Sequence, residues 1–420
     1  MKIAIVGAGV IGVTTAHELA ADGHEVTVFE RHAAVAEEAS FANGGVVGPG
    51  YLALAGPPAG LRTEGGRPAT LPWPPSRAGL RWRSAARRAN APERWADSRR
   101  RLLALANYSR ERLHALSLDL QLEYDCAPGC LVLWRTDKDR AAHQETLAFL
   151  QEAGVRHEEL SPEGVRALEP GLNPETPLAG ALHLPDDGVA NCRQFTLLLR
   201  RAAQALGAHF AFRCEVAPLD RSAPTLLRVT QADGSTESLR FDAVVLCVGA
   251  GSAALLRPLG LPPAVPLMAA QRHSIRAPLG EPLNAPESAV IDAQRQVSIS
   301  RLGQRLRVAG GAALDSTAGR RDPEAIAGLY GVLQDWFPAG ALLSGRCATV
   351  QEWSGTRAVL PDGPPVLGAS GVPGIWLNLG HGDHGWGLAC GSARVVADQL
   401  ASRPPAIDTD GLGITRLLDA

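Results

Sequence analysis

Three glycines near the start of the chain are spaced for phosphate binding. Gly7, Gly9 and Gly12 form GxGxxG between the apolar run KIAIV and the segment VIGVTTAHELAAD, whose apolar residues recur at helical spacing. Glycines at such a turn permit a tight bend, and the backbone N–H groups at the helix start can meet a pyrophosphate. Glu30 ends the following strand, HEVTVFE, where a carboxylate can accept both hydroxyls of a ribose. These residues predict a dinucleotide site.

A secretory signal is the alternative interpretation of this stretch. Such a signal also has a charged start, an apolar stretch and small residues near its end. However, Gly23 stops the expected helix and a second patterned strand follows it directly. We therefore expect a β-α-β unit.

The rest of the chain predicts an α/β fold in which two kinds of segment alternate. Helices are expected at 101–118, 137–154 and after residue 190, a strand at 130–136, and a loop at 179–190. From 265 to 310 five short alternating runs indicate an antiparallel sheet: VPLMA, HSIRA, SAVIDA, QVSIS and RLRVAG. The Pro- and Gly-rich residues 56–76 are expected to be irregular.

This pattern predicts a Rossmann-like domain assembled from discontinuous segments, with an inserted α+β substrate domain built on a mostly antiparallel sheet. The nucleotide-binding domain is expected to comprise 1–50, 145–262 and 350–420, and the substrate domain 51–144 and 263–349.

Composition narrows the classes of partner. The chain has 420 residues, 45% hydrophobic and 20% charged, with a formal net charge of −2, which gives no reason to expect a nucleic-acid partner. No apolar stretch is long enough to span a bilayer. The seven scattered cysteines favour a reducing compartment over a disulfide framework. The CAPGC pair Cys126 and Cys130 is expected to lie in a turn as small filling residues, and no second pair or nearby His cluster completes a metal site. The arginine-rich segment 77–101 is either a solvated helical face or a surface that docks on a membrane or an electron acceptor.

Several motifs together resemble a known family. They are SFANGG followed by PGY (40–51), LPDDG (184–188), GTRAVLPDGPPVLG (355–368) and LGHGDHGWGLACGS (379–392). With GxGxxG and Glu30, they resemble the flavin-dependent amine oxidoreductases of the D-amino-acid oxidase and glycine/sarcosine oxidase family, and within it the bacterial D-amino-acid dehydrogenases. The likeness runs nearly end to end.

The resemblance implies FAD as the cofactor. It implies a loop at 40–45 along the pyrophosphate and flavin, a backbone contact of Val216 with adenine, and a closing turn at Gly249. The segment 382–388 is expected at the pyrimidine edge of the flavin, where a following helix N-terminus would stabilise the negative charge of the reduced ring. The expected cofactor-binding residues are Gly7, Gly9, Val10, Ile11, Gly12, Glu30, Arg31, Ser40, Asn43, Gly44, Gly45, Val216, Gly249, Gly382, Gly385, Trp386, Gly387 and Leu388.

Arg357 in GTRA is the expected clamp for a substrate carboxylate, because arginine supplies a planar bidentate donor. A structural pair with Asp362 is the alternative, and Ala358 stands where the family usually has proline. In MAAQRHSI (268–275), which departs from the usual Lys-Gly-Tyr type of turn, Arg272 and His273 are candidates to face the substrate. The remaining catalytic candidates are Tyr51, either an active-site lid or a core aromatic, and His384, either a substrate contact or a helix cap.

The resemblance implies oxidative deamination of a D-amino acid. Hydride would pass from the substrate Cα to flavin N5, and water would hydrolyse the imino acid to a 2-oxo acid and ammonia. An oxidase or dehydrogenase of glycine, sarcosine or a D-hydroxyproline-type secondary amine is the alternative, and a non-catalytic flavin-binding subunit the third. The expected electron acceptor is a quinone or another respiratory carrier. The expected location is the cytoplasm, with possible peripheral contact at the inner face of the cell membrane.

Overall fold

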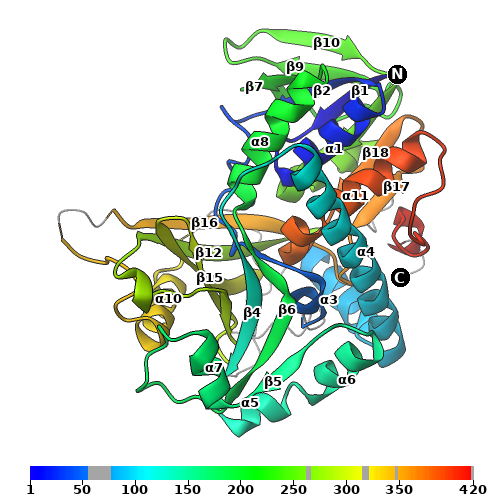
Figure 1. Cartoon of the computed structure of the whole chain (residues 1–420). Coiled ribbons are helices and arrows are strands. Elements are labelled where there is room, and N and C mark those ends of the chain that lie inside the picture. The colour runs from blue at the N-terminus through cyan, green and yellow to red at the C-terminus, as the bar shows by residue number, and fades with distance from the viewer. Residues whose placement is uncertain (55–76, 262–265, 315–320, 346–348, 418–420) are drawn as a thin grey trace.

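The computed structural model describes residues 1–54, 77–261, 266–314, 321–345 and 349–417. The expected β-α-β unit is present: strand β1 (Lys2–Val6), helix α1 (Val10–Ala21) and strand β2 (Glu25–Glu30), with β1 and β2 parallel. The proline- and glycine-rich stretch 56–76, expected to be irregular, lies outside the described residues. The opening segment is therefore the first unit of an α/β domain (Figure 1).

A six-stranded sheet is built from segments far apart in the sequence. Its order is β17 (Val366–Ala369), β18 (Ile375–Leu379), β11 (Ala243–Leu246), β1, β2 and β7 (His209–Phe212). All neighbours are parallel except β17, which is antiparallel to β18. Helices α1, α4 (Pro92–Asp119), α8 (Cys192–Ala205) and α11 (Gly385–Leu400) pack on one face. The expected assembly of a Rossmann-like domain from discontinuous segments is confirmed.

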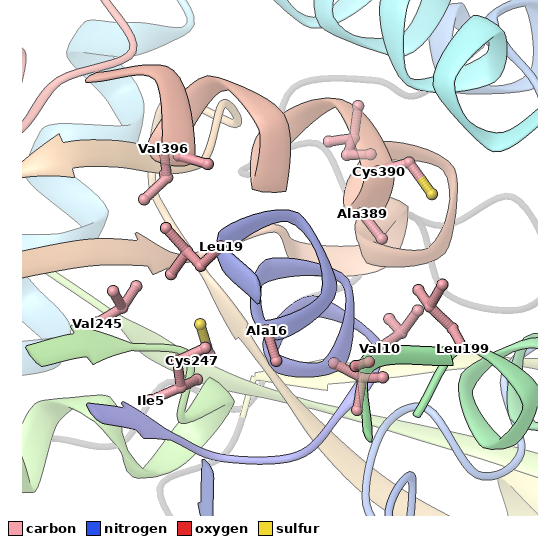
Figure 2. Close-up of a cluster of buried hydrophobic side chains, with 14 of the residues drawn as sticks. Ile5, Val10, Ala16, Leu19, Leu199, Val245, Cys247, Ala389, Cys390 and Val396 are labelled. Carbon is pink, nitrogen blue, oxygen red and sulfur yellow. The ribbon is translucent and has the colours of Figure 1, made fainter. Parts of the chain in front are cut away.

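Helix α1 lies in the centre of the largest apolar cluster. Figure 2 shows α1 between the strands that carry Ile5 and Val245 and the helix that carries Val396. The unbroken apolar runs of β1 and β11 are explained by burial on both faces, since Ala4 and Val244 belong to a second cluster on the opposite side of the sheet. A rigid α1 fixes the position of the glycine turn at its start.

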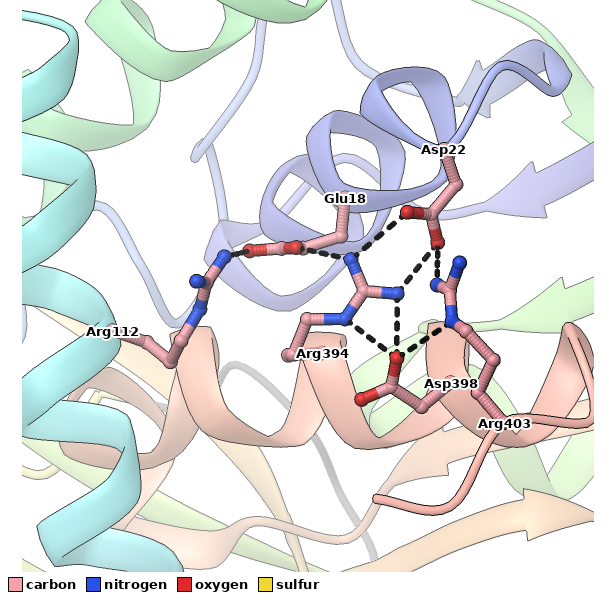
Figure 3. A network of polar contacts seen from close by, with 6 residues as sticks. All are labelled: Glu18, Asp22, Arg112, Arg394, Asp398 and Arg403. Carbon is pink, nitrogen blue, oxygen red and sulfur yellow. Dashed lines mark hydrogen bonds and ion pairs between the residues drawn. The ribbon is translucent and has the colours of Figure 1, made fainter. Parts of the chain in front are cut away.

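A polar network joins the other end of α1 to α11 and α4. Arg394 of α11 binds Glu18, Asp22 and Asp398, with N–O distances of 2.7, 2.5 and 3.0 Å. Figure 3 shows that Arg112 of α4 reaches the other oxygen of Glu18, and that Arg403 also binds Asp22 and Asp398. The side chain of Glu18 is only 2% exposed, so a buried carboxylate lies where α1, α4 and α11 meet.

The second sheet forms the other half of the molecule. Its order is β16 (Gln351–Val359), β12 (Met268–Pro278), β15 (Arg305–Leu314), β14 (Val297–Leu302), β13 (Ala289–Asp292), β4 (Cys126–Trp134), β6 (Gly180–Ala190) and β3 (Val46–Val47), with β5 (Glu158–Leu160) on β6. Only the β13–β4 pair is parallel, so the expected mostly antiparallel sheet is confirmed. Helix α10 (Pro323–Trp336) packs against β12, β14 and β15.

The remaining elements are short or peripheral. They are α2 (Pro49–Ala53), α3 (Arg77–Ala89), α5 (Asp137–Ala141), α6 (Gln144–Glu152), α7 (Pro162–Leu168), β8 (Glu215–Val216), β9 (Leu226–Thr230), β10 (Thr236–Arg240) and α9 (Ser252–Leu256). Strands β8, β9 and β10 form a small separate sheet.

Five local expectations were wrong. The expected loop at 179–190 is β6, because its residues pair with β4, β5 and β3. The runs VPLMA and HSIRA do not form two strands, since 268–278 is the single strand β12. The helix expected at 101–118 begins at Pro92, and the one expected at 137–154 is divided into α5 and α6. Cys126 and Cys130 lie in β4 rather than in a turn.

Strands β6 and β16 bear on the expected division into domains. Both fall within ranges assigned from sequence to the nucleotide-binding domain, yet both pair within the nine-stranded sheet. The division itself stays a prediction.

Candidate active site

A cavity of about 730 Å³ lies between the two sheets. The carboxyl ends of β1, β2, β11 and β18 form one side, as expected where parallel strands end together. Residues of β12 and β16, on the nine-stranded sheet, form another part of its wall. Its volume is within the usual range for cofactor and substrate sites.

The glycine turn between β1 and α1 allows three backbones to approach closely. A Cβ on Gly7, whose φ is +100°, would lie 2.7 Å from the carbonyl oxygen of Cys247, and one on Gly12 would lie 1.9 Å from the carbonyl oxygen of Gly7. Only glycine therefore lets β1, α1 and the end of β11 meet here. Gly12 packs against the Gly7 carbonyl and does not line the cavity.

Glu30 and Ser40 complete the nucleotide end of the cavity. The Glu30 carboxylate accepts hydrogen bonds from the backbone N–H groups of Ala8 at 2.7 Å and His32 at 2.8 Å. Ser40 Oγ accepts from the N–H of Val10 at 3.0 Å, at the start of α1. Both side chains line the cavity, so a carboxylate and a helix N-terminus face the same space.

Two side chains of the nine-stranded sheet bind the loop at residues 40–45. The Arg307 guanidinium donates to the carbonyl oxygen of Asn43 at 3.0 Å, and Ser300 Oγ donates to that of Gly44 at 3.0 Å. Burial lowers the pKa of Arg307 to about 10. The loop that resemblance places along the flavin is thus attached to β14 and β15.

Fifteen of the expected cofactor-binding residues line this cavity. They are Gly7, Gly9, Val10, Ile11, Glu30, Arg31, Ser40, Asn43, Gly44, Gly45, Val216, Gly249, Gly382, Gly385 and Trp386. Gly12, Gly387 and Leu388 do not, and Leu388 is fully buried in the apolar cluster around α1. The contacts of each residue with a cofactor remain predictions.

These residues fit FAD. The glycine turn and the α1 N-terminus provide donors for a pyrophosphate, and Glu30 provides an acceptor for a ribose. The short turn at Gly382–His384, followed by α11, brings a second helix N-terminus to the other end of the cavity. Nearby, the buried Asn378 Oδ1 has no hydrogen-bond partner among the described residues.

Two arginines share one carboxylate at the far end of the cavity. Arg357 of β16 donates from Nη1 to Asp383 Oδ1 at 2.7 Å, and Arg272 of β12 donates from Nε to the same oxygen at 2.9 Å and from Nη2 to Oδ2. Burial raises the pKa of Asp383, but the two guanidiniums outweigh it and hold the pKa well below its usual range. All three residues line the cavity.

Asp362, the alternative partner considered for Arg357, does not pair with it. Asp362 pairs with Arg416 instead, at 2.6 Å, and lies outside the cavity lining. Ala358, which stands where proline is usual, is a buried residue of β16 opposite Ala269. The strand therefore continues through this position and still presents Arg357 to the cavity.

Tyr51 lines the cavity from the short helix α2. Asp187 of the LPDDG motif accepts from the backbone N–H groups of Gly50 at 3.1 Å and Tyr51 at 2.5 Å, which fixes the helix start. Burial raises the pKa of the Tyr51 hydroxyl, and burial raises that of Asp187 to about 6. His384 does not line the cavity, and its ring packs edge-on against Tyr51 with centroids 6.3 Å apart.

His273 does not join the arginine cluster. Its Nδ1 lies 2.7 Å from Ser354 Oγ, and its backbone pairs with the same residue. The pairing of β12 with β15 shifts register between Gln271 and His273, so the regular alternation of side chains is interrupted at Arg272. His273 reaches the cavity wall, but its side chain is directed toward Ser354 and its pKa is lowered by burial.

Asp187 and Asp383 are the positioning residues that the sequence did not reveal as such. Both stand inside motifs that carried the resemblance, LPDDG and GHGDHG, but no role was assigned to either. Their partners come from β12, β16 and α2, which no spacing within the motifs could indicate. An acid within a glycine-rich turn was the available signal.

Comparison with known proteins identifies the family. A model of the FAD-dependent oxidoreductase family matches residues 2–399, so the chain belongs to this family and its cofactor is FAD. A protein of Bradyrhizobium diazoefficiens named D-amino acid dehydrogenase is 38% identical, and one of that name from Chromohalobacter salexigens is 37% identical; each match covers 99% of both chains.

Solved structures support the same fold. Glycine oxidase from Geobacillus kaustophilus aligns with a TM-score of 0.75 at 22% identity, covering 99% of this chain and 98% of that one. L-proline dehydrogenase from P. horikoshii aligns with a TM-score of 0.72 at 17% identity, covering 100% and 98%. At these identities, the likeness concerns the fold.

Proposed function

We propose that this protein oxidises D-amino acids, removing a hydride from Cα and releasing, after hydrolysis, a 2-oxo acid and ammonia. The proposal rests above all on Arg357, a guanidinium at the substrate end of the cofactor cavity with Nε and Nη2 unpaired among the described residues. Full-length relatives named D-amino acid dehydrogenase favour the D-amino acid as substrate.

Each residue near Arg357 has a distinct part in this proposal. FAD, when bound, supplies the hydride acceptor. Arg357 binds the α-carboxylate in a bidentate manner, and Asp383 holds its guanidinium from the other side. Tyr51, half-buried, lines the cavity, and because burial raises its pKa its hydroxyl stays neutral and adds no charge. The chain's main contribution is orientation of Cα.

Anaerobic mixing of the holoenzyme with D- and L-amino acids tests this function. D-Alanine should bleach the flavin absorbance and L-alanine should not. Arg357→Ala should weaken kcat/KM by a factor that corresponds to about 2–5 kcal/mol, since it removes one partner of a charge pair, and Arg357→Lys should lose less. Asp362→Asn, in an ion pair outside the cavity, is the matched control. Bleaching by sarcosine or D-proline alone, or unchanged turnover by Arg357→Ala, would contradict the proposal.

We also propose a quinone or another respiratory carrier as electron acceptor, with α3 facing the membrane. No helix in the described part of the chain has both the length and the apolar character needed to cross a bilayer. Helix α3 is anchored by the buried Trp82, while Arg81 and Arg87 are exposed beside Leu80, which is 66% exposed. Co-sedimentation with anionic vesicles should fall in Arg81→Ala/Arg87→Ala; equal binding of the variant would contradict the contact.

A further inference from the structure

Arg307 of β15 is a buried cation that pairs with no carboxylate in the described part of the chain. The residue is 5% exposed. Its Nη1 donates to the carbonyl oxygen of Asn43 at 3.0 Å, while its Nε has no hydrogen-bond partner among the residues that the structure describes. Its pKa, lowered by burial to about 10, still leaves it charged near neutral pH. A buried charge without a counter-charge is strongly unfavourable, which points to a negative partner outside the polypeptide.

The neighbours of Arg307 add positive charge. Arg276 of β12 stands opposite Arg307 in the pairing of β12 with β15. After burial, repulsion from Arg276 and Arg193 lowers the pKa of Arg307, although Arg193 itself pairs with Glu37 at 3.0 Å. Burial raises the pKa of the nearby Cys192 thiol to about 11, so this thiol stays neutral. Because like charges opposite each other in a sheet are destabilising, the arrangement again favours an anionic ligand.

The side chain of Arg307 faces the loop at residues 40–45. Ser298 of β14 pairs with Ala309, two residues along β15, and both line the cofactor cavity. Val308 belongs to the apolar cluster around α10 on the opposite face of the sheet. Because side chains alternate along β15, Arg307 shares the cavity side with Ala309. Arg307 does not line the cavity itself, so its charge must act across the loop.

We propose that the positive charge of Arg307 acts through this loop on bound FAD and raises the reduction potential of the flavin. The inference uses the predicted place of the loop along the flavin. Reduction by two electrons and one proton leaves a negative charge on the flavin ring at neutral pH. A fixed cation nearby stabilises that charge more than it stabilises the neutral oxidised ring. Arg307 is thus a positioning residue whose charge has an effect of its own.

Coulomb's law sets the expected size of the effect. Unit charges about 10 Å apart, at an effective dielectric constant of about 20, interact strongly enough to change an equilibrium constant by roughly tenfold. For a two-electron couple, a tenfold change corresponds to about 30 mV. Removal of the Arg307 charge should therefore lower the flavin potential by about that amount.

Redox titration of the holoenzyme against reference dyes tests this inference. Arg307→Met removes the charge and keeps most of the side-chain length, so the equilibrium constant for flavin reduction should fall about tenfold. Arg307→Lys keeps the charge and should stay within about threefold of the parent. If Arg307→Met retained no FAD, Arg307→Gln, which keeps a neutral donor near Asn43, should show the same fall. A neutral variant with the potential of the parent would overturn the inference.

Ser300→Ala separates the charge of Arg307 from its hold on the loop. Ser300 Oγ donates to the carbonyl oxygen of Gly44 at 3.0 Å, so alanine removes a bond to the same loop without changing any charge. The potential should stay at the parent value even where FAD binds less tightly. An equal fall of the potential in Ser300→Ala and Arg307→Met would overturn the inference, because displacement of the loop would then explain both.

Binding of the cofactor gives a second readout. The apoprotein is titrated with oxidised FAD in air and with reduced FAD under anaerobic conditions. By linkage, Arg307→Met should lose about tenfold more affinity for reduced FAD than for oxidised FAD. Equal weakening of both forms would show that Arg307 only holds the loop, and would overturn the inference. No amino acid takes part in either measurement, so a failure of the proposed function would leave this test intact.

Discussion

Substitution of Arg394 by methionine should destabilise the protein through a defined mechanism. Arg394 lies on α11, binds Glu18 and Asp22 of α1, and is 12% exposed (Figure 3). Methionine keeps most of the side-chain length and removes the charge. The two carboxylates of α1 would lose their shared partner while staying in place.

The loss follows from burial. Glu18 is 2% exposed, and removing one partner of a buried pair costs about 3–5 kcal/mol. Glu18 keeps Arg112 at 2.7 Å and Asp22 keeps Arg403, so we expect the lower end, about 3 kcal/mol. For 420 residues the unfolding entropy is about 0.9 kcal/mol/K, so the midpoint should fall by about 3 °C.

Thermal unfolding at a fixed FAD concentration checks this value, because bound cofactor itself stabilises the fold. Arg100→Met is the matched control, since its partner Asp97 and Arg100 itself are exposed, and we expect less than about 1 kcal/mol from that pair. If Arg394→Met unfolded at the same temperature as Arg100→Met, the buried network would not stabilise the junction of α1, α4 and α11.

Three further variants test packing and buried polar groups. Burial raises the pKa of Asp187 to about 6, so the folded state binds this proton more tightly than the unfolded state, and the free energy of unfolding falls as pH rises between about 4 and 6. The stability of Asp187→Asn relative to the parent, measured by urea unfolding, should therefore rise by about 3 kcal/mol across that pH window. A difference in stability that does not change with pH would refute this. Gly391→Ala places a Cβ 2.9 Å from the Ser109 backbone and should lower the free energy of unfolding by about 1–3 kcal/mol, seen as a lower urea midpoint. An unchanged midpoint would show that α4 can shift. Trp336→Phe removes a 2.8 Å hydrogen bond to the buried Asp292 and should cost about 1–3 kcal/mol by the same assay, whereas equal stability would mean that Arg135 suffices.

Local patterns were sufficient for the nucleotide-binding end. Gly12 meets Gly7 within one strand-turn-helix unit, so the glycine spacing predicts the turn, whereas the close approach of Gly7 to Cys247 of the distant β11 could not be predicted from it. Glu30 ends the adjacent strand of the same unit. The types and order of these residues fix their geometry, and Gly7, Gly9 and Glu30 line the cavity as expected. Distant lining residues such as Val216, Gly249 and Gly382 were expected through the family resemblance and not through a local pattern.

The substrate end depended on contacts between distant segments. In β6, the sequence LPDDG has the composition of a turn, and only its pairing with β4 and β3 makes it a strand. Arg272, Arg357 and Asp383 come from two strands and a turn that meet through the fold. His273 lies beside an irregularity in the pairing of β12 with β15, and β12 had been expected as two separate strands, so its contact with Ser354 could not be predicted.

The interleaving of segments has a consequence for synthesis of the protein. The wall of the cavity includes Val6 at one extreme and Trp386 at the other, and β1 pairs with β11 more than two hundred residues later. A ribosome must therefore release almost the whole polypeptide before FAD finds a complete binding site. Until then, the apolar edges of β1 stay unprotected, so cofactor supply and chaperones should limit the yield of active enzyme more than the rate of translation does.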